Sequence, residues 1–250
     1  FFASHRWGDG EGIFHYSNEA RNILRACIHK GENGRPGAAM WNRENKQILF
    51  VPGSAFTDPS YHLPHFYELF ALWADEEAAC ASREYLVKAC HPVTGMNPEY
   101  GNFDGTPMSK KMPWGGRHDQ FYSDAYRTAA NIGLDCAWFG DDKGHYSGPL
   151  RLMRFLGTDL EGARCVYEVD GKPVDMTVLH PLGLLATTAQ GALTVAKEDS
   201  DDPNSDWNVA KRWVEWFWNQ PMRKGSRRYY DNCLYLFALL ALSGNYRIYK

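Results

Sequence analysis

An acidic residue set between aromatic residues, with an arginine three positions later, is the pattern in this sequence best suited to chemistry. The segment reads Phe121-Tyr122-Ser123-Asp124-Ala125-Tyr126-Arg127. Apolar residues at helical spacing follow it to about Phe139, so Asp124 and Arg127 are expected to share the first turn and one face of a helix. An acidic residue at a helix start is often a cap. Aromatic rings beside a forked cation also suit a sugar site, in which rings stack and charged groups hold hydroxyls.

Other residues that could do chemistry lack the companions that their chemistry needs. Trp114 lies in a glycine-flanked loop before Asp124, where its ring could stack on a sugar or cover the core. His62 and His65 share a helix turn but have no recognisable further metal ligands. The turn Trp7–Gly12 lacks the lysine and preceding strand of a phosphate loop. We therefore expect neither a metal ion nor an organic cofactor.

Composition indicates one folded domain. The chain has 250 residues, of which 44% are hydrophobic and 14% aromatic, and this excludes a disordered protein. No linker or low-complexity segment divides residues 1–250, so a single domain is expected. A net charge of −3 is too small to predict nucleic acid or an anionic membrane as a partner. The longest apolar stretch, Leu234 to Leu242, is too short to span a membrane.

The cysteines and the start of the chain bear on location. None of the six cysteines forms a CxxC pair, which favours free core thiols and a cytoplasmic protein. Phe1–Trp7 reads as the end of an apolar helix rather than a signal peptide. We expect that the front of the native protein precedes Phe1, and this leaves export undecided.

Periodicity predicts a scaffold of helices joined by long loops. A short strand is expected at Ile48–Val51 and a hairpin over residues 166–174, around an Asp-Gly turn. Loops as long as residues 94–118 are usually functional, so an all-helical fold that carries a groove fits best. Helices are predicted at residues 17–28, 58–73, 76–90, 124–139, 141–155, 181–196, 206–219 and 229–242.

Six motifs, in order along the whole chain, resemble glycoside hydrolase family 8. Within that family the closest resemblance is to the reducing-end xylose-releasing exo-oligoxylanases. The motifs are His5-Arg6-Trp7-Gly8-Asp9-Gly10, Asp58-Pro59-Ser60-Tyr61, Phe66-Tyr67-Glu68-Leu69-Phe70-Ala71, Ser123-Asp124-Ala125-Tyr126-Arg127, Leu179-His180-Pro181-Leu182-Gly183 and Tyr229-Tyr230-Asp231-Asn232. Together they are specific, whereas each alone is weak.

The resemblance implies an (α/α)6 barrel with the substrate groove across one end, and one catalytic domain over residues 1–250 that lacks its N-terminal part. It implies hydrolysis of short β-1,4-xylooligosaccharides with inversion, by a monomer without cofactor or metal. Inversion needs a carboxylic acid and a carboxylate roughly 6.5–9.5 Å apart, with a water molecule between the carboxylate and the sugar.

Residue roles follow from the same resemblance. Asp124 matches the general base and Tyr61 a tyrosine that holds the attacking water. Arg127 matches a sugar-binding arginine, and either Tyr229 or Tyr230 a subsite tyrosine. Without the resemblance, Tyr61 would be read as a packing residue and Arg127 as part of an ordinary ion pair.

His180 carries the expected exo specificity. In the resembling exo-enzymes a Leu-His-Pro loop closes the groove beyond the leaving sugar, whereas an isolated His-Pro pair is usually packed in a turn.

The general acid of the family lies upstream of the Phe1 position, and neither Glu68 nor Glu99 matches its motif. Two alternatives stay open: an endo-acting xylanase, glucanase or chitosanase of the family, and an oligosaccharide-binding domain without catalysis.

Overall fold

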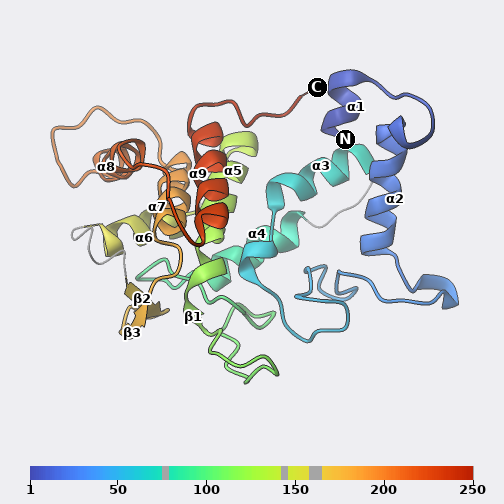
Figure 1. Cartoon of the computed structure of the whole chain (residues 1–250), viewed down its shortest axis with the longest axis horizontal. Helices are drawn as coiled ribbons and strands as arrows, with labels where there is room; N and C mark the ends of the chain where they lie inside the picture. Colours follow the sequence, from blue (N-terminus) through green and yellow to red (C-terminus); the bar gives the residue numbers. More distant parts are fainter. Residues whose placement is uncertain (75–78, 142–145, 158–164, 250) are drawn as a thin grey trace.

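The structure, a computed structural model, describes residues 1–74, 79–141, 146–157 and 165–249. Its regular structure is mainly helical, with a small sheet at one side (Figure 1). None of the helices in the described ranges is long and apolar enough to cross a membrane. The α-helices are α1 (Phe2–Trp7), α2 (Tyr16–Ile28), α3 (Pro64–Ala74), α4 (Ala79–Ala89), α5 (Arg127–Phe139), α6 (Gly148–Leu156), α7 (Pro181–Gln190), α8 (Asp206–Trp218) and α9 (Arg228–Leu242).

The helices match most of the predicted ranges, with differences at their ends. The helix predicted at residues 181–196 ends at Gln190 and is followed by a 3₁₀ turn, η6 (Gly191–Thr194). The predicted helix at residues 58–73 begins only at Pro64, because a proline disfavours helical backbone in the residue before it and itself suits the first helical position. Asp58 instead caps a 3₁₀ turn, η3 (Pro59–Tyr61). Parts of the predicted helices 76–90 and 141–155 lie outside the described residues.

The sheet contains three antiparallel strands in the order β1-β2-β3: β1 (Gln120–Phe121), β2 (Cys165–Glu168) and β3 (Pro173–Thr177). Strands β2 and β3 form the hairpin predicted around Asp170-Gly171, where Gly171 has a φ of 95°. The predicted strand at Ile48–Val51 is wrong, since this segment contributes only an isolated bridge between Ile48 and Trp41. Strand β1 was not predicted, and it ends shortly before the turn that carries Asp124.

The main core lies between α5, α6, α7, α8 and α9. Helix α7 packs against both α5 and α9, and all of its residues from Leu182 to Gln190 are buried. Trp213 and Phe217 of α8 extend this core, so two of the closely spaced aromatic residues of α8 are packing residues. Figure 1 shows α5, α7 and α9 as neighbours, with Ser123–Tyr126 at one end of this group. The core thus supports the segment that carries Asp124.

Candidate active site

Asp124 lies on a 3₁₀ turn, η4 (Ser123–Tyr126), that precedes α5. Its neighbours Ala125 and Tyr126 are buried, whereas the Asp124 side chain is 37% exposed. Ser123 has a φ of 44°, in the left-handed region that side chains rarely adopt. The positions that cap η4 and α5 are occupied by Tyr122 and Tyr126, so Asp124 is not the N-cap of either segment. The turn is anchored in the core and presents its carboxylate to solvent.

Two side chains hold the Asp124 carboxylate. The hydroxyl of Tyr230 on α9 donates a hydrogen bond to Oδ1 over 2.9 Å. Burial raises the pKa of Tyr230, so this hydroxyl keeps its proton and remains a donor. On the other side, Nη2 of Arg127 lies 3.2 Å from Oδ2. Together the two contacts fix the direction in which the Asp124 carboxylate points.

Arg127 joins Asp124 to the segment before α3. Its Nη2 donates to the hydroxyl of Ser60 over 2.7 Å and lies 3.6 Å from Oδ2 of Asp58. The amide of Asn131, one helical turn further along α5, donates to the backbone oxygen of Ser60 over 2.9 Å. The 3₁₀ turn that carries Tyr61 is therefore fixed against α5 by hydrogen bonds from two residues.

Tyr61 lies beside the same guanidinium. The Cζ atom of Arg127 is 5.8 Å from the centre of the Tyr61 ring, and the Phe50 ring stacks on Tyr61 at 5.9 Å. Burial and the nearby Asp58 raise the pKa of Tyr61, so its hydroxyl is neutral and can both donate and accept. Tyr61, Arg127 and Asp124 are thus brought together, as the sequence predicted for one site.

Asp58 is a site residue that the sequence reasoning used only as part of a motif. Its carboxylate is fully buried; Oδ1 accepts from the N–H and the hydroxyl of Ser60 over 2.7 and 2.6 Å, while Oδ2 has no hydrogen-bond partner. Burial raises the pKa of Asp58 to about 7, although the charge of Arg127 opposes this. A second carboxyl group, which exchanges its proton near neutral pH, therefore lies next to the Arg127 guanidinium.

The ring of His180 packs against that of Tyr230, whose hydroxyl bonds Asp124. The two rings are 4.4 Å apart at an angle of 46°. His180 precedes α7, and its Nδ1 lies 3.4 Å from the buried carboxylate of Asp231. A continuous series of contacts therefore runs from His180 through Tyr230 to Asp124.

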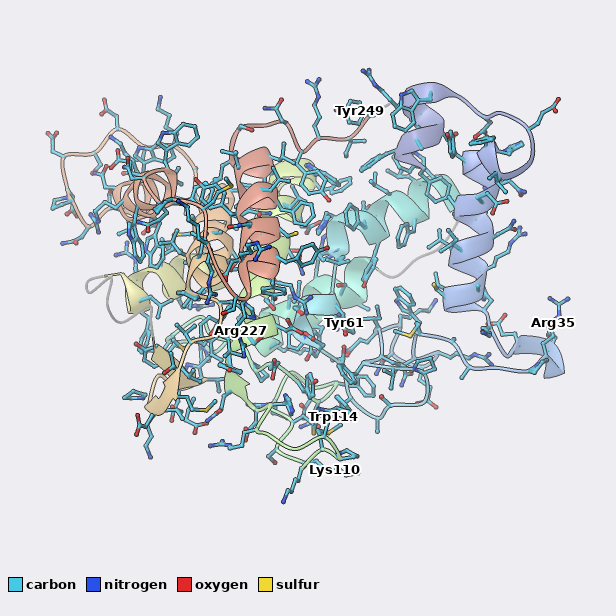
Figure 2. The ribbon with its side chains drawn as sticks, viewed as in Figure 1. Arg35, Tyr61, Lys110, Trp114, Arg227 and Tyr249 are labelled. Carbon is cyan, nitrogen blue, oxygen red and sulfur yellow. The ribbon has the colours of Figure 1, made fainter. Side chains whose placement is uncertain are left out.

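Tyr229 and Trp114 lie apart from this series of contacts. Tyr229 is 82% exposed and lines a surface hollow of about 690 Å³ with Met222 and Leu236, whereas its neighbour Tyr230 contacts Asp124. Trp114 is 56% exposed, and its ring lies 5.9 Å from that of Phe50, the residue that also stacks on Tyr61. Figure 2 labels Trp114 below Tyr61, on the loop side of the molecule. Of the two tyrosines, the geometry places Tyr230 at the candidate base.

The two glutamates considered as acids have other partners. Glu68 pairs with Arg83 over 2.8 Å, and the same arginine also pairs with the buried Asp135. Glu99 lies 2.5 Å from Nδ1 of His118, and burial raises the pKa of Glu99. Within the described residues no group of three or more His, Cys, Asp or Glu side chains could hold a metal ion.

Comparison with known proteins identifies relatives of this chain, although no family model matches it. A reducing end xylose-releasing exo-oligoxylanase from Halalkalibacterium halodurans is 52% identical over 257 residues, covering 100% of this chain and 62% of the relative. One from Bifidobacterium adolescentis is 54% identical, covering 99% of this chain and 64% of the relative. This chain is a homologue of the exo-oligoxylanases. The predicted resemblance is confirmed.

Solved structures agree with the exo-oligoxylanase homology. The structure of Rex8A from Paenibacillus barcinonensis complexed with xylose superimposes with a TM-score of 0.88 at 49% identity, covering 100% of this chain and 65% of that chain. An endoglucanase A from Acetivibrio thermocellus is a more distant match at 26% identity, covering 98% of this chain and 47% of the relative. The chain spans less than two thirds of the length of the exo-oligoxylanases that it matches.

Proposed function

We propose that this chain carries the general base of an inverting glycoside hydrolase that releases xylose from the reducing end of short β-1,4-xylooligosaccharides. The observation that carries the proposal is the Asp124 carboxylate, open to solvent and held by Tyr230 and Arg127. The homology to exo-oligoxylanases over almost the whole chain supports the substrate class.

The geometry gives each residue a role in this proposal. Asp124 takes a proton from a water molecule as that water attacks the anomeric carbon. The neutral hydroxyl of Tyr61, on the neighbouring turn, holds this water. Arg127 holds the Asp124 carboxylate in place and binds the sugar at the cleavage point. Acid and base hydrolysis of this kind requires neither a metal nor a cofactor.

The general acid is proposed to lie outside residues 1–250, within the additional length of the relatives. The described carboxylates support this, because Glu68 and Glu99 are already paired with Arg83 and His118. The same proposal includes a complete (α/α)6 barrel formed by one monomeric domain.

Location in the cytoplasm stays a prediction from the cysteines. The described side chains of Cys27, Cys90, Cys136 and Cys233 are free thiols.

His180 favours the exo-acting form over the endo-acting alternative. It precedes α7 beside Tyr230, where a side chain could close the groove one sugar beyond the cleaved bond. The identity of about 50% to exo-oligoxylanases, against 26% to an endoglucanase, favours the same choice.

The test is the product pattern from xylotriose and from polymeric xylan. We expect xylose and xylobiose from xylotriose and little cleavage of the polymer, and ¹H NMR should show new xylobiose first as the α anomer, because inversion converts a β linkage. The chain should be assayed alone and together with any sequence that its gene encodes before Phe1. Activity of residues 1–250 alone would refute the placement of the acid, and random shortening of xylan would refute the exo specificity. Xylotriose binding with no cleavage by either form would favour the binding domain.

A further inference from the structure

A series of hydrogen bonds connects a buried carboxyl group to the candidate base. The hydroxyl of Ser60 donates to Oδ1 of Asp58 over 2.6 Å and accepts a hydrogen bond from Nη2 of Arg127 over 2.7 Å. The same nitrogen lies 3.2 Å from Oδ2 of Asp124. Ser60 is buried, and the Asn131 amide donates to its backbone oxygen over 2.9 Å. The position of the guanidinium beside Asp124 is therefore set from the segment before α3.

The second oxygen of Asp58 offers the guanidinium an alternative partner. Oδ2 is buried, has no hydrogen-bond partner and lies 3.6 Å from Nη2 of Arg127, roughly 0.8 Å farther than a charge-assisted hydrogen bond. Nη2 carries two protons, and one of them is donated to Ser60. Only one N–H of Nη2 therefore remains for Oδ2 of Asp124 or for Oδ2 of Asp58.

The proton of Asp58 decides between these two acceptors. Because Oδ1 already accepts two hydrogen bonds from Ser60, the proton of the neutral carboxyl group is on Oδ2, which then has no charge to attract Arg127. An ionised carboxylate at this buried position is costly unless a cation pairs with it. Burial raises the pKa of Asp58 to about 7, so both forms are populated near neutral pH.

Arg127 on α5 is the cation that faces Asp58 among the described residues, and Asp124 on η4 is the other carboxylate. His62 follows η3, and burial lowers its pKa to about 3, so its ring is neutral. The tyrosines that face Asp58 are also neutral, because burial raises the pKa of each: Tyr61 of η3, Tyr85 of α4, Tyr100 of the loop after α4 and Tyr230 of α9. Of these groups, only Arg127 carries the charge that ionised Asp58 attracts.

We propose that Ser60 and Asp58 are positioning residues, which hold the Arg127 guanidinium against Asp124 while Asp58 carries its proton and draw it away once Asp58 is ionised. The consequence for hydrolysis rests on the proposed function. A guanidinium that has moved to Asp58 no longer fixes the direction of the Asp124 carboxylate or reaches the sugar at the cleavage point. Xylose release should therefore decline as Asp58 loses its proton.

Crystal structures at about pH 5.5 and about pH 8.5, on either side of the Asp58 pKa, test the movement without an activity assay. At the lower pH we expect Nη2 of Arg127 beside Asp124. At the higher pH we expect it within about 2.9 Å of Oδ2 of Asp58 and farther from Asp124. In Asp58→Asn, which cannot ionise, the two structures should be the same. A wild-type Arg127 in the same position at both pH values would overturn the proposal.

Hydrolysis of xylotriose by the active protein tests the consequence. We expect the kcat/KM of Asp58→Asn, divided by that of the wild type, to rise about tenfold from pH 6 to pH 8, because only the wild type loses a hydrogen bond between charged groups. This ratio cancels the pH dependence that both proteins share through the general acid and the base. Asp206→Asn, which removes an exposed carboxylate, should give a ratio that does not change with pH. A constant ratio for Asp58→Asn would overturn the proposal.

Ser60→Ala tests the hydroxyl independently of the carboxyl proton. Nη2 of Arg127 then loses its 2.7 Å acceptor, so kcat/KM should fall about tenfold even at the pH where Asp58 is protonated. An unchanged kcat/KM in this variant would overturn the role of Ser60. No xylose release by any form, together with the expected movement of Arg127 in the crystals, would refute the proposed function and leave the movement established.

Discussion

Replacing Asp58 with asparagine should make the stability of the chain less dependent on pH. One oxygen of this buried carboxylate accepts two hydrogen bonds from Ser60, and the other has no hydrogen-bond partner. Asparagine retains an oxygen for Ser60 and has nearly the same shape. The variant therefore differs from the wild type chiefly because it cannot ionise.

The magnitude follows from the pKa of Asp58, which burial raises from 3.8 to about 7. As the pH rises between these two values, the unfolded chain loses the proton and the folded chain keeps it, so the wild type loses stability. At lower pH both states are protonated, and at higher pH both are ionised, so the effect is confined to this interval. It corresponds to roughly 4 kcal/mol of the free energy of unfolding, which the variant does not lose.

The assay is urea unfolding of the wild type and Asp58→Asn at a series of pH values spanning the interval. The difference in free energy of unfolding should move in favour of the variant as the pH rises and should then level off. Asp206→Asn is the matched control, since it removes a 58% exposed carboxylate and should show no such trend. If the difference between wild type and Asp58→Asn is the same on both sides of the interval, Asp58 ionises like an exposed carboxyl and our reading of the buried pair with Arg127 is wrong.

Three further predictions concern the base and the scaffold. Asp124→Asn should lower xylose release by the active protein by about 10²–10⁴-fold, with folding unchanged by circular dichroism; near-normal activity would remove Asp124 as the base. Tyr230→Phe should lower kcat about 10–100-fold, because it removes a hydrogen bond to a charged group worth about 1.5–3 kcal/mol, and the exposed Tyr229→Phe should have little effect; equal losses would refute the assignment of Tyr230. Arg83→Ala should reduce the free energy of unfolding by about 3 kcal/mol or more in urea, since it leaves the buried Asp135 carboxylate without its two 2.8 Å hydrogen bonds; a loss below 1 kcal/mol would contradict this.

Long amphipathic segments made much of the fold predictable. The helix predicted at residues 206–219 is α8 (Asp206–Trp218), and the one predicted at 229–242 is α9 (Arg228–Leu242). Each has a sustained helical period, and α8 has a serine cap, so local sequence determines its extent. The start of α3 was misplaced because the break in the helix before Pro64 follows from one proline rather than from periodicity.

The candidate site was predictable only where a motif carried it. Asp124 and Arg127 are neighbours in sequence, and their ion pair follows from a spacing of three residues. The hydrogen bond from Tyr230 to Asp124 joins positions 106 residues apart, and no local pattern distinguishes Tyr230 from Tyr229. The buried state of Asp58 likewise depends on packing between η3 and α5, which a single sequence does not reveal.

The left-handed backbone at Ser123 has a consequence for engineering. Glycine adopts this conformation without strain, so Ser123→Gly is a substitution that a search for heat-resistant variants would favour. The same change would make the backbone directly before Asp124 more flexible and widen the range of directions in which the Asp124 carboxylate points. Thermal tolerance and turnover should therefore trade against each other at this one position.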